Sequence, residues 1–261
     1  MRVAVCAKQI PDPANPAKLN PLTLTLDRTE RPVLDEADSY GVEVGLRLVQ
    51  QAGGGEVTLV SMAPGAQVAG LRTALAMGAA SAILISDPVL AGSDALGTAK
   101  VLAAAIGQVS PDLVVTATES TDGYTGTLAA QLAELLGLPS ITFAKRVELA
   151  PDGCAIRVWR QTESGDDEVE CPLPALVSVT AGTVEPRYPS YRGIVAAKSK
   201  PVAQPSLAEL GLAADQVGTS GARQSLIALT AGESPQAGEL VVDEGNAHEA
   251  IIALLERLRV I

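Results

Sequence analysis

A chain of 261 residues is long enough for one large domain with an appendage or for two small domains. Hydrophobic residues make up 47% but aromatic residues only 2%, so the core has to be built from Ala, Val, Leu and Ile, which favours an α/β fold. The 19 Lys and Arg residues are outnumbered by 30 Asp and Glu residues, and the net charge of −11 argues against binding to nucleic acids or to anionic lipid surfaces.

The cysteines and the lengths of the apolar runs indicate the cellular compartment of the protein. Cys6, Cys154 and Cys171 are an odd number without paired spacing, which argues against a disulfide framework and a structural zinc site. The apolar run before Lys8 is too short for a signal peptide, and no apolar stretch approaches the roughly 20 residues that a membrane helix needs. We therefore expect a soluble, cytoplasmic protein that does not insert into membranes.

Apolar runs alternate with helix-period segments through the first half of the chain. Strands are predicted at 3–7, 56–62, 81–86, 112–118 and 140–144, and helices at 38–51, 68–77, 93–108 and 125–136. Runs that are apolar on both faces are typical of buried parallel strands, and short links between β and α units imply a doubly wound sheet. The sequence therefore predicts a Rossmann-like, mainly parallel α/β core over residues 1–181.

The pattern changes after Arg146. The stretches RVELAPDGCAIRVWRQ and EVECPLPALVSVT predict short strands, which we expect as antiparallel additions at an edge of the sheet. A Pro-rich segment follows at 182–205, and an extended C-terminal arm occupies 206–261. Within this arm we predict a short helix near 207–210, a polar loop at 213–238 and a last helix at 247–258. Because the arm lacks a core of its own, we expect it to pack on another protein.

The loop after the fourth predicted strand has the composition of an anion site. It runs through Thr121, Asp122 and Gly123 into a helix start at 125–127, and such a start presents free backbone N–H groups and the positive end of the helix dipole. At the carboxyl end of a parallel strand this loop would suit a nucleotide phosphate. The same residues could instead only cap the helix. The glycine patterns of NAD-binding and P-loop sites do not follow any strand, which disfavours both kinds of site.

Other strand ends add candidates to the same crevice. Cys6 follows the first strand and Met62 ends the second. Asp35 and Asp38 could accept hydrogen bonds from a ribose or an adenine amine, or could serve as N-cap and first-turn acids. The one histidine, His248, lies in the last predicted helix, and no catalytic triad, paired carboxylates or metal cluster is evident. We expect no metal site and no catalytic residue in this chain.

The stretch GTVEPRYPSYRGIVAAKSKP contains Tyr188 and Tyr191, two of only four tyrosines. Pro186 and Pro189 stiffen this stretch, and Gly193 would let the chain turn back. So much proline makes core packing a poor use of the tyrosines, and we expect them to contact other proteins. The alternative is that they cover the neighbouring polypeptide, which we expect for Tyr188.

Four stretches together, VAVCAKQIPD, STDGYTGT, PALVSVT and EPRYPSYRGIVAAKSKP, resemble the electron transfer flavoprotein β subunit family. LRTALAMGA and the order of the predicted elements agree, so the resemblance spans nearly the whole chain. It implies a β subunit that carries a structural AMP and forms a heterodimer with an α subunit that holds the redox FAD. It also implies that this heterodimer passes electrons from flavin dehydrogenases to a quinone oxidoreductase or a similar acceptor.

The resemblance further implies which residues contact AMP, with the adenine toward the first two strands and the phosphate at the helix start. These residues are Cys6, Asp35, Asp38, Met62, Thr121, Asp122, Gly123, Tyr124, Thr125, Gly126 and Thr127. It also implies a loop that docks on partner dehydrogenases, formed by Glu185, Pro186, Arg187, Tyr188 and Tyr191. By position the projecting anchor is Tyr191, where many members of the family have Leu.

Two alternatives remain open. The chain could be a stand-alone α/β protein that binds or hydrolyses a nucleotide, as the fold alone would permit. It could also be a bifurcating member of the family, in which a second FAD replaces AMP. The bulk of Tyr124 and the Thr125-Gly126 pair favour AMP.

Overall fold

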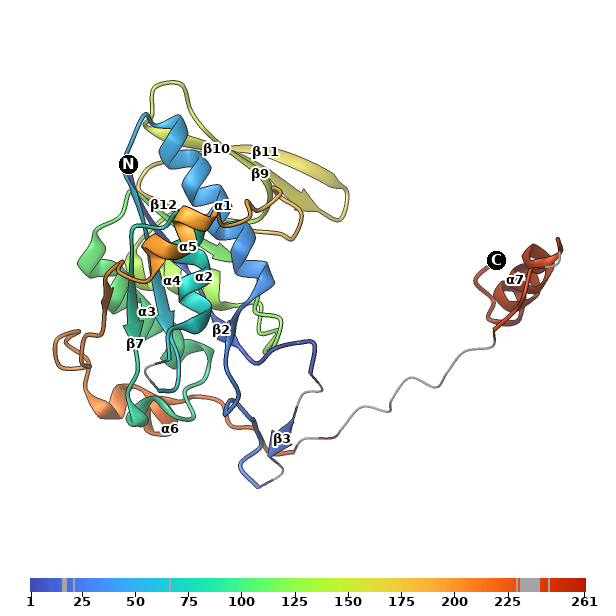
Figure 1. The fold of residues 1–261 in the computed structure, drawn as a ribbon, viewed down its shortest axis with the longest axis horizontal. Coiled ribbons are helices and arrows are strands. Elements are labelled where there is room, and N and C mark those ends of the chain that lie inside the picture. Colours follow the sequence, from blue (N-terminus) through green and yellow to red (C-terminus); the bar gives the residue numbers. More distant parts are fainter. Residues whose placement is uncertain (16–17, 21, 66, 229, 231–239, 244) are drawn as a thin grey trace. The chain divides into compact units, whose positions relative to one another are not determined.

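The computed structural model of the chain describes residues 1–15, 18–20, 22–65, 67–228, 230, 240–243 and 245–261 (Figure 1). The chain forms two compact units, Met1–Ile227 and Ala228–Ile261. The first unit holds the predicted core, the predicted docking segment and the beginning of the predicted arm. The second unit holds the last helix.

Within the described residues, the first unit is built around a nine-stranded sheet with the order β11-β10-β9-β12-β8-β1-β6-β7-β13. Its strands are β1 (Arg2–Cys6), β6 (Glu56–Met62), β7 (Ser81–Ile85), β8 (Leu113–Ala117), β9 (Ser140–Leu149), β10 (Ala155–Thr162), β11 (Gly165–Pro172), β12 (Ala175–Val179) and β13 (Val202–Ala203). Neighbours from β9 to β13 in this order pair in parallel, whereas β10 is antiparallel to both β9 and β11. The predicted mainly parallel α/β sheet with antiparallel edge strands is confirmed.

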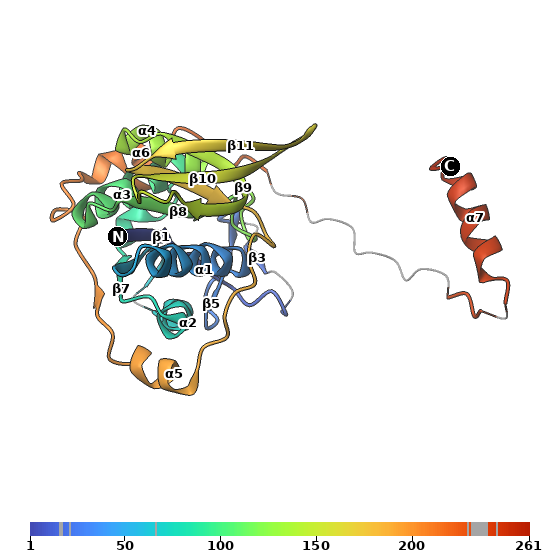
Figure 2. The same ribbon diagram turned by 90° about the horizontal axis from the view of Figure 1, so that it is seen from above.

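Helices cover both faces of this sheet, with α1, α2 and α5 on one face and α3 and α4 on the other (Figure 2). The helical elements are α1 (Glu36–Gln51), α2 (Ala69–Met77), α3 (Ala95–Val109), α4 (Leu128–Leu136), α5 (Tyr191–Ala197), α6 (Gly218–Gly221) and the 3₁₀ turns η1 (Pro88–Leu90) and η2 (Ala214–Gln216). Alternate residues of β1 show the division, because Val3 and Val5 pack in the core under α1 and α2, whereas Ala4 and Cys6 pack under α3 and α4. Doubly wound sheets are apolar on both faces for this reason.

The local sequence explains where the main helices begin and end. Asp35 caps α1 by accepting a hydrogen bond from the N–H group of Ala37, and Asp94 caps α3 in the same way. α4 ends at Gly137, whose φ of 65° is easy for glycine. Two small antiparallel ribbons follow β1, formed by β2 (Gln9–Ile10) with β5 (Val33–Leu34) and by β3 (Leu19–Asn20) with β4 (Thr25–Leu26).

One strand lies elsewhere than predicted. We expected the stretch PALVSVT at the edge of the sheet in antiparallel pairing, but β12 lies between β9 and β8 and is parallel to both. Every residue of β12 is buried, whereas β11 at the edge is largely exposed. The run of β12, apolar except for Ser178, therefore belongs inside a parallel sheet, where both faces are covered.

Two features after β12 also differ from the prediction. Residues 207–211 form successive turns instead of a short helix, and the last of them, Gly211, has a φ of 69°. The predicted docking loop contains α5, which is capped by Ser190, so Gly193 lies inside a helix and not at a return of the chain. A Cβ atom at Gly193 would lie 2.4 Å from the carbonyl oxygen of Ala76, so only glycine permits this approach of α5 to α2.

The second unit contains α7 (Ala247–Arg257), which confirms the predicted last helix. Ile251, Ile252 and Leu254 of this helix are exposed. Part of the polar loop predicted at 213–238 lies outside the described residues. In the parts of the chain that are described, no helix is long and apolar enough to cross a membrane.

Candidate functional site

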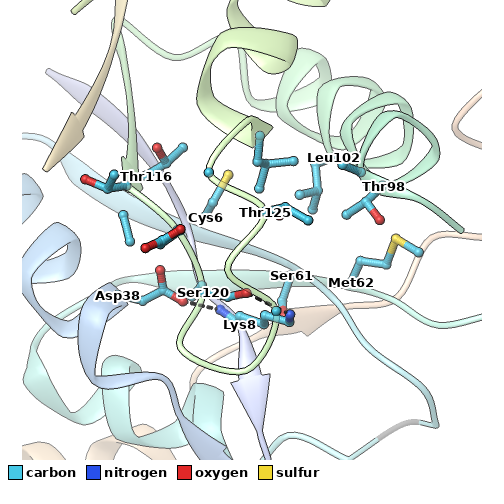
Figure 3. A pocket seen from close by; sticks show the side chains of 18 of the residues that line it. Cys6, Lys8, Asp38, Ser61, Met62, Thr98, Leu102, Thr116, Ser120 and Thr125 are labelled. Atoms are coloured by element: carbon cyan, nitrogen blue, oxygen red, sulfur yellow. Dashed lines mark hydrogen bonds between the residues drawn. The ribbon is translucent and has the colours of Figure 1, made fainter. Parts of the chain in front are cut away.

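A cavity of about 320 Å³ lies at the carboxyl ends of β1, β6 and β8 (Figure 3). Cys6 and Lys8 line it from the end of β1, Ser61 and Met62 from the end of β6, and residues 116–120 from the end of β8. Ligands of open parallel sheets bind at this edge, where the loops to the helices diverge. The volume lies at the small end of the usual range for ligand sites, which suits a small organic molecule.

The N-termini of α3 and α4 line the same cavity. At α3, Asp94 accepts hydrogen bonds from the N–H groups of Gly97 and Arg223, both at 2.7 Å, so a carboxylate of the chain already caps this helix start. At α4, the N-cap residue Thr127 makes no side-chain capping bond. Among the described residues, the N–H groups from Thr125 to Leu128 also have no hydrogen-bond partner, and they lie at the positive end of the helix dipole, as an anion site requires.

Two buried hydroxyl groups of the cavity wall have no hydrogen-bond partner among the described residues. These are Ser61 Oγ at the end of β6 and Thr116 Oγ1 in β8. Their residues are only 1% and 2% exposed. Because an unpaired buried hydroxyl destabilises the fold, such groups at a cavity indicate a polar ligand that completes their hydrogen bonds.

Asp38 and Cys6 supply ionisable groups to the inner end of the cavity. Burial raises the pKa of Asp38 to about 8, against the opposing effect of the hydrogen bond from Lys8 N at 2.6 Å. Burial also raises the pKa of the Cys6 thiol to about 12, and the Asp38 charge adds to this shift. Both side chains are therefore mainly protonated at neutral pH, and this end suits an uncharged polar ring. In the described parts of the chain, no group of three or more His, Cys, Asp or Glu side chains is placed to hold a metal ion.

Hydrogen bonds and ion pairs outside the cavity fix the loop between β8 and α4. Asp122 accepts hydrogen bonds from Lys8 Nζ at 2.5 Å and from Arg28, and its side chain is only 6% exposed. Burial alone would raise the pKa of Asp122, but Lys8 and Arg28 outweigh it and hold this pKa below its usual value. The backbone N–H and the hydroxyl of Thr121 both donate to the buried carboxylate of Asp35, at 2.8 and 3.0 Å. The loop is thus rigidly placed against the first turn of α1.

The residues predicted to contact AMP divide into three groups. Those that line the cavity are Cys6, Asp38, Met62, Gly123, Thr125 and Gly126. Asp35, Thr121 and Asp122 support the loop from outside the cavity. Tyr124 is 67% exposed and lines a neighbouring hollow of about 520 Å³ with residues of the 10–30 segment, and Thr127 occupies the N-cap position of α4.

Sequence reasoning missed several lining residues, namely Ser61, Ser93, Asp94, Thr98, Thr116 and Gln224. At Ser93 and Asp94 we predicted only a helix start. Thr116 carried a usable signal, because it is the polar residue of the otherwise apolar strand β8, whereas Ser61 shares β6 with Glu56 and Thr58 and does not stand out. Gln224 reaches the cavity from the beginning of the arm, for which no local pattern gives a signal.

The predicted docking residues do not all face the solvent. Tyr188 and Tyr191 are 91% and 82% exposed. The expectation that Tyr188 covers the neighbouring polypeptide is therefore wrong, because the segment turns this ring away from the chain. Arg187 turns inward onto α1, Pro186 is half-buried and Glu185 is exposed.

Comparison with known proteins gives concordant matches. The family model for the electron transfer flavoprotein domain matches residues 23–210. Electron transfer flavoprotein subunit beta of Mycobacterium tuberculosis is 37% identical, over 99% of both chains. The subunit of the same name from Thermoanaerobacterium thermosaccharolyticum is 34% identical, and the caffeyl-CoA reductase-Etf complex subunit CarD of Acetobacterium woodii is 32% identical, each over 99% of this chain and 98% of its own. With its mainly parallel α/β sheet and matches along its whole length, the chain belongs to the electron transfer flavoprotein β subunit family.

Proposed function

We propose that this chain holds AMP in the cavity at the carboxyl edge of the sheet and pairs with an α subunit that carries FAD. Membership of the family assigns the chain to electron transfer. The observation that carries the AMP proposal is the pair of buried hydroxyl groups without a partner in the described chain, on Ser61 and Thr116, two residues that line the cavity. A nucleotide is rich in hydrogen-bonding groups and would complete both.

The residues present fit AMP at both ends of the cavity. The N–H groups from Thr125 to Leu128 would hold the phosphate at the start of α4. Ser61 and Thr116 would bind the polar edge of the nucleoside, and the protonated Cys6 and Asp38 suit a neutral adenine. AMP would supply these hydrogen bonds and no redox chemistry. By binding only the folded chain, it would stabilise the fold.

The proposed heterodimer would carry electrons from flavin dehydrogenases to a quinone oxidoreductase or a similar acceptor, and FAD held mainly by the α subunit would supply the redox chemistry. The designation of the relatives as beta subunits supports a second subunit. This chain contributes structure, AMP and a docking surface, without catalytic residues of its own. Its three cysteines are all free, as is usual in a reducing cytoplasm, where we place the complex.

The docking surface of the proposal is the segment 184–200, with Tyr191 as the anchor. An exposed aromatic ring offers a large contact area and loses little conformational freedom when a partner binds. Tyr191 opens α5, and Ile194 and Val195 lie on the same face of this helix and are about half exposed. Within the first unit, this apolar face of α5 is therefore exposed, and a protein partner could bind it.

The test is to purify the complex and to identify what comes with this chain. A second, flavin-bearing chain is expected to co-purify, and mass spectrometry of the extract should find one flavin and one AMP per complex. Two flavins per complex would show that a second FAD takes the place of AMP, as in the bifurcating alternative. Nucleotide hydrolysis by the purified chain in the absence of a second subunit would favour the stand-alone alternative and contradict the proposal.

A further inference from the structure

The segment 184–200, proposed above as the docking surface, is fixed to the first unit at three points. Arg187 binds α1, and Gly193 lets α5 approach α2 closely. Lys200 donates from Nζ to two carbonyl oxygens at the end of α2, at 2.8 and 2.6 Å. Arg72 of α2 donates in return to the carbonyl oxygen of Lys200 at 2.8 Å. These contacts fix the segment against both α1 and α2.

Glu43 of α1 provides the first of these contacts, and its side chain is only 3% exposed. Glu43 Oε2 accepts from Arg187 Nε at 2.6 Å and from the backbone N–H of Arg187 at 3.3 Å, while Oε1 accepts from Arg187 Nη2 at 3.0 Å. Arg47, one turn further along α1, donates to Glu43 Oε1 at 2.8 Å. Burial would raise the pKa of Glu43, but the two guanidinium groups outweigh it and keep this pKa below its usual value. The carboxylate is therefore charged at neutral pH.

The position of Arg187 suggests that its contact with Glu43 does more than stabilise the fold. Arg187 directly precedes Tyr188, and the three residues 188–190, which have no regular secondary structure, separate it from Tyr191. Glu43 binds both the side chain and the main chain of Arg187, so it fixes the point from which the exposed aromatic rings project. The flanking Pro186 and Pro189 restrict the backbone on either side.

We infer that Glu43 is a positioning residue for partner docking: its buried carboxylate holds Arg187 and thereby presents Tyr188 and Tyr191 in the geometry that a partner dehydrogenase binds. This inference rests on the proposed docking function of the segment. Glu43 contacts no partner itself and acts through Arg187.

Preorganisation is the physical basis of this role. Ordering a flexible segment during association lowers the affinity, and a segment that is rigid beforehand avoids this loss. Without the Glu43 contact, fewer molecules would present the aromatic rings correctly at any time. The loss should therefore appear in the KM for the dehydrogenase, while kcat stays unchanged once the complex has formed.

The test compares Glu43→Gln with the wild type in the complete complex of both subunits. Gln keeps the shape of Glu and removes the charge. The probe is a purified flavin dehydrogenase, reduced by its own substrate, that passes electrons to the wild-type complex. We expect Glu43→Gln to raise the KM about tenfold, with kcat and the flavin spectrum unchanged. Hydrogen exchange of the Ile194 amide, which donates to the Ser190 carbonyl oxygen at 2.9 Å in the first turn of α5, should become faster.

Val42→Ala is the matched control, because Val42 precedes Glu43 on α1 and is fully buried in the core. This variant should lower the melting temperature but leave both the KM and the Ile194 exchange rate as in the wild type. An equal rise in KM for Val42→Ala and Glu43→Gln would overturn the inference, since the effect would then be general destabilisation.

Tyr191→Ala separates the inference from the function on which it rests. If Tyr191→Ala raises the KM and Glu43→Gln does not, the docking proposal stands and the positioning role of Glu43 is wrong. If neither variant changes the KM, the docking function of the segment fails, and the inference fails with it.

Discussion

Asp38 and Glu43 are buried carboxyl groups on the same helix, α1, yet they serve two different regions. Asp38 faces the cavity, where burial dominates and raises its pKa to about 8. Glu43 lies under the docking segment, where Arg187 and Arg47 outweigh burial and keep its pKa below the usual value. The protein thus holds one carboxyl protonated and the other charged within a short distance along one helix.

This difference teaches how to tell a binding site from a structural contact. A buried carboxyl without a cation is costly to the fold, and such groups are concentrated at functional sites. A buried carboxylate that is matched by guanidinium groups is a fixing point for another segment. Asp35, the N-cap of α1, is also a fixing point, but it holds the cavity loop through hydrogen bonds from Thr121 instead of through guanidinium groups. α1 therefore positions both functional regions.

The largest effect is expected for Asp35→Ala, which tests whether α1 controls the cavity independently of the docking segment. The substitution removes the cap of α1 and leaves both donors of Thr121 without their acceptor. Unfolding in urea should show a loss of about 3 kcal/mol. AMP should be lost from the purified complex, while hydrogen exchange in α5 stays as in the wild type.

Asp35→Asn is the control for this prediction. It keeps an oxygen acceptor at the cap, so we expect a smaller loss of stability than for alanine. If Asp35→Ala disturbs α5 as much as it disturbs the cavity loop, the two regions are not separable and the comparison breaks down.

A second, smaller effect is expected for Asp38→Asn and depends on pH. Because the pKa of Asp38 is raised from 3.8 to about 8 in the folded chain, the folded state binds more protons than the unfolded state between these values. This group therefore favours the fold at low pH, and its contribution is lost as the pH rises toward 8. The free energy of unfolding of Asp38→Asn, taken relative to that of the wild type and measured in urea, should rise by about 2.6 kcal/mol as the pH goes from ~5 to ~7.

Glu43→Gln should show the opposite trend in the same experiment, which sharpens the comparison. Because the folded-state pKa of Glu43 is lowered, its carboxylate stabilises the fold at neutral pH, and this contribution is lost as the pH falls through the folded-state pKa. Glu43→Gln should therefore differ most from the wild type at neutral pH and least in acid. If the free energies of unfolding of Asp38→Asn and Glu43→Gln, each relative to the wild type, change with pH in the same direction, the pKa values of the two carboxyl groups are not shifted in opposite directions.

The smallest effect is expected for Thr116→Val, which tests the cavity side of the comparison. Valine has the shape of threonine without the hydroxyl that lacks a partner in the described chain. The Kd for AMP, measured by calorimetry on the complex after its nucleotide has been removed, should rise about fivefold, the equivalent of one neutral hydrogen bond. Thr58→Val is the matched control, because Thr58 Oγ1 already pairs with Ser81 Oγ at 3.2 Å in a neighbouring strand. Equal Kd values for wild type and Thr116→Val would mean that this hydroxyl does not bind the nucleotide.

Local patterns predicted much of the fold and part of the site. The alternation of apolar runs and helix-period segments predicted the α/β sheet, and the helices predicted at 93–108 and 125–136 correspond to α3 and α4. Strand ends pointed to Cys6 and Met62, because in a parallel sheet these ends converge on one edge, and the start of the first helix pointed to Asp38. Such features are encoded within a few residues, by burial period and by capping chemistry.

The sequence alone was enough to predict the class of fold and the edge of the sheet at which the cavity lies, and it also indicated the exposure of Tyr191. Only the tertiary structure decided that β12 inserts between β8 and β9, that Ser61 and Thr116 are left without partners, and that Glu43 meets Arg187. The physical reason is that periodicity and composition report how each residue is buried, whereas the partner that it meets depends on the order in which distant strands and helices pack.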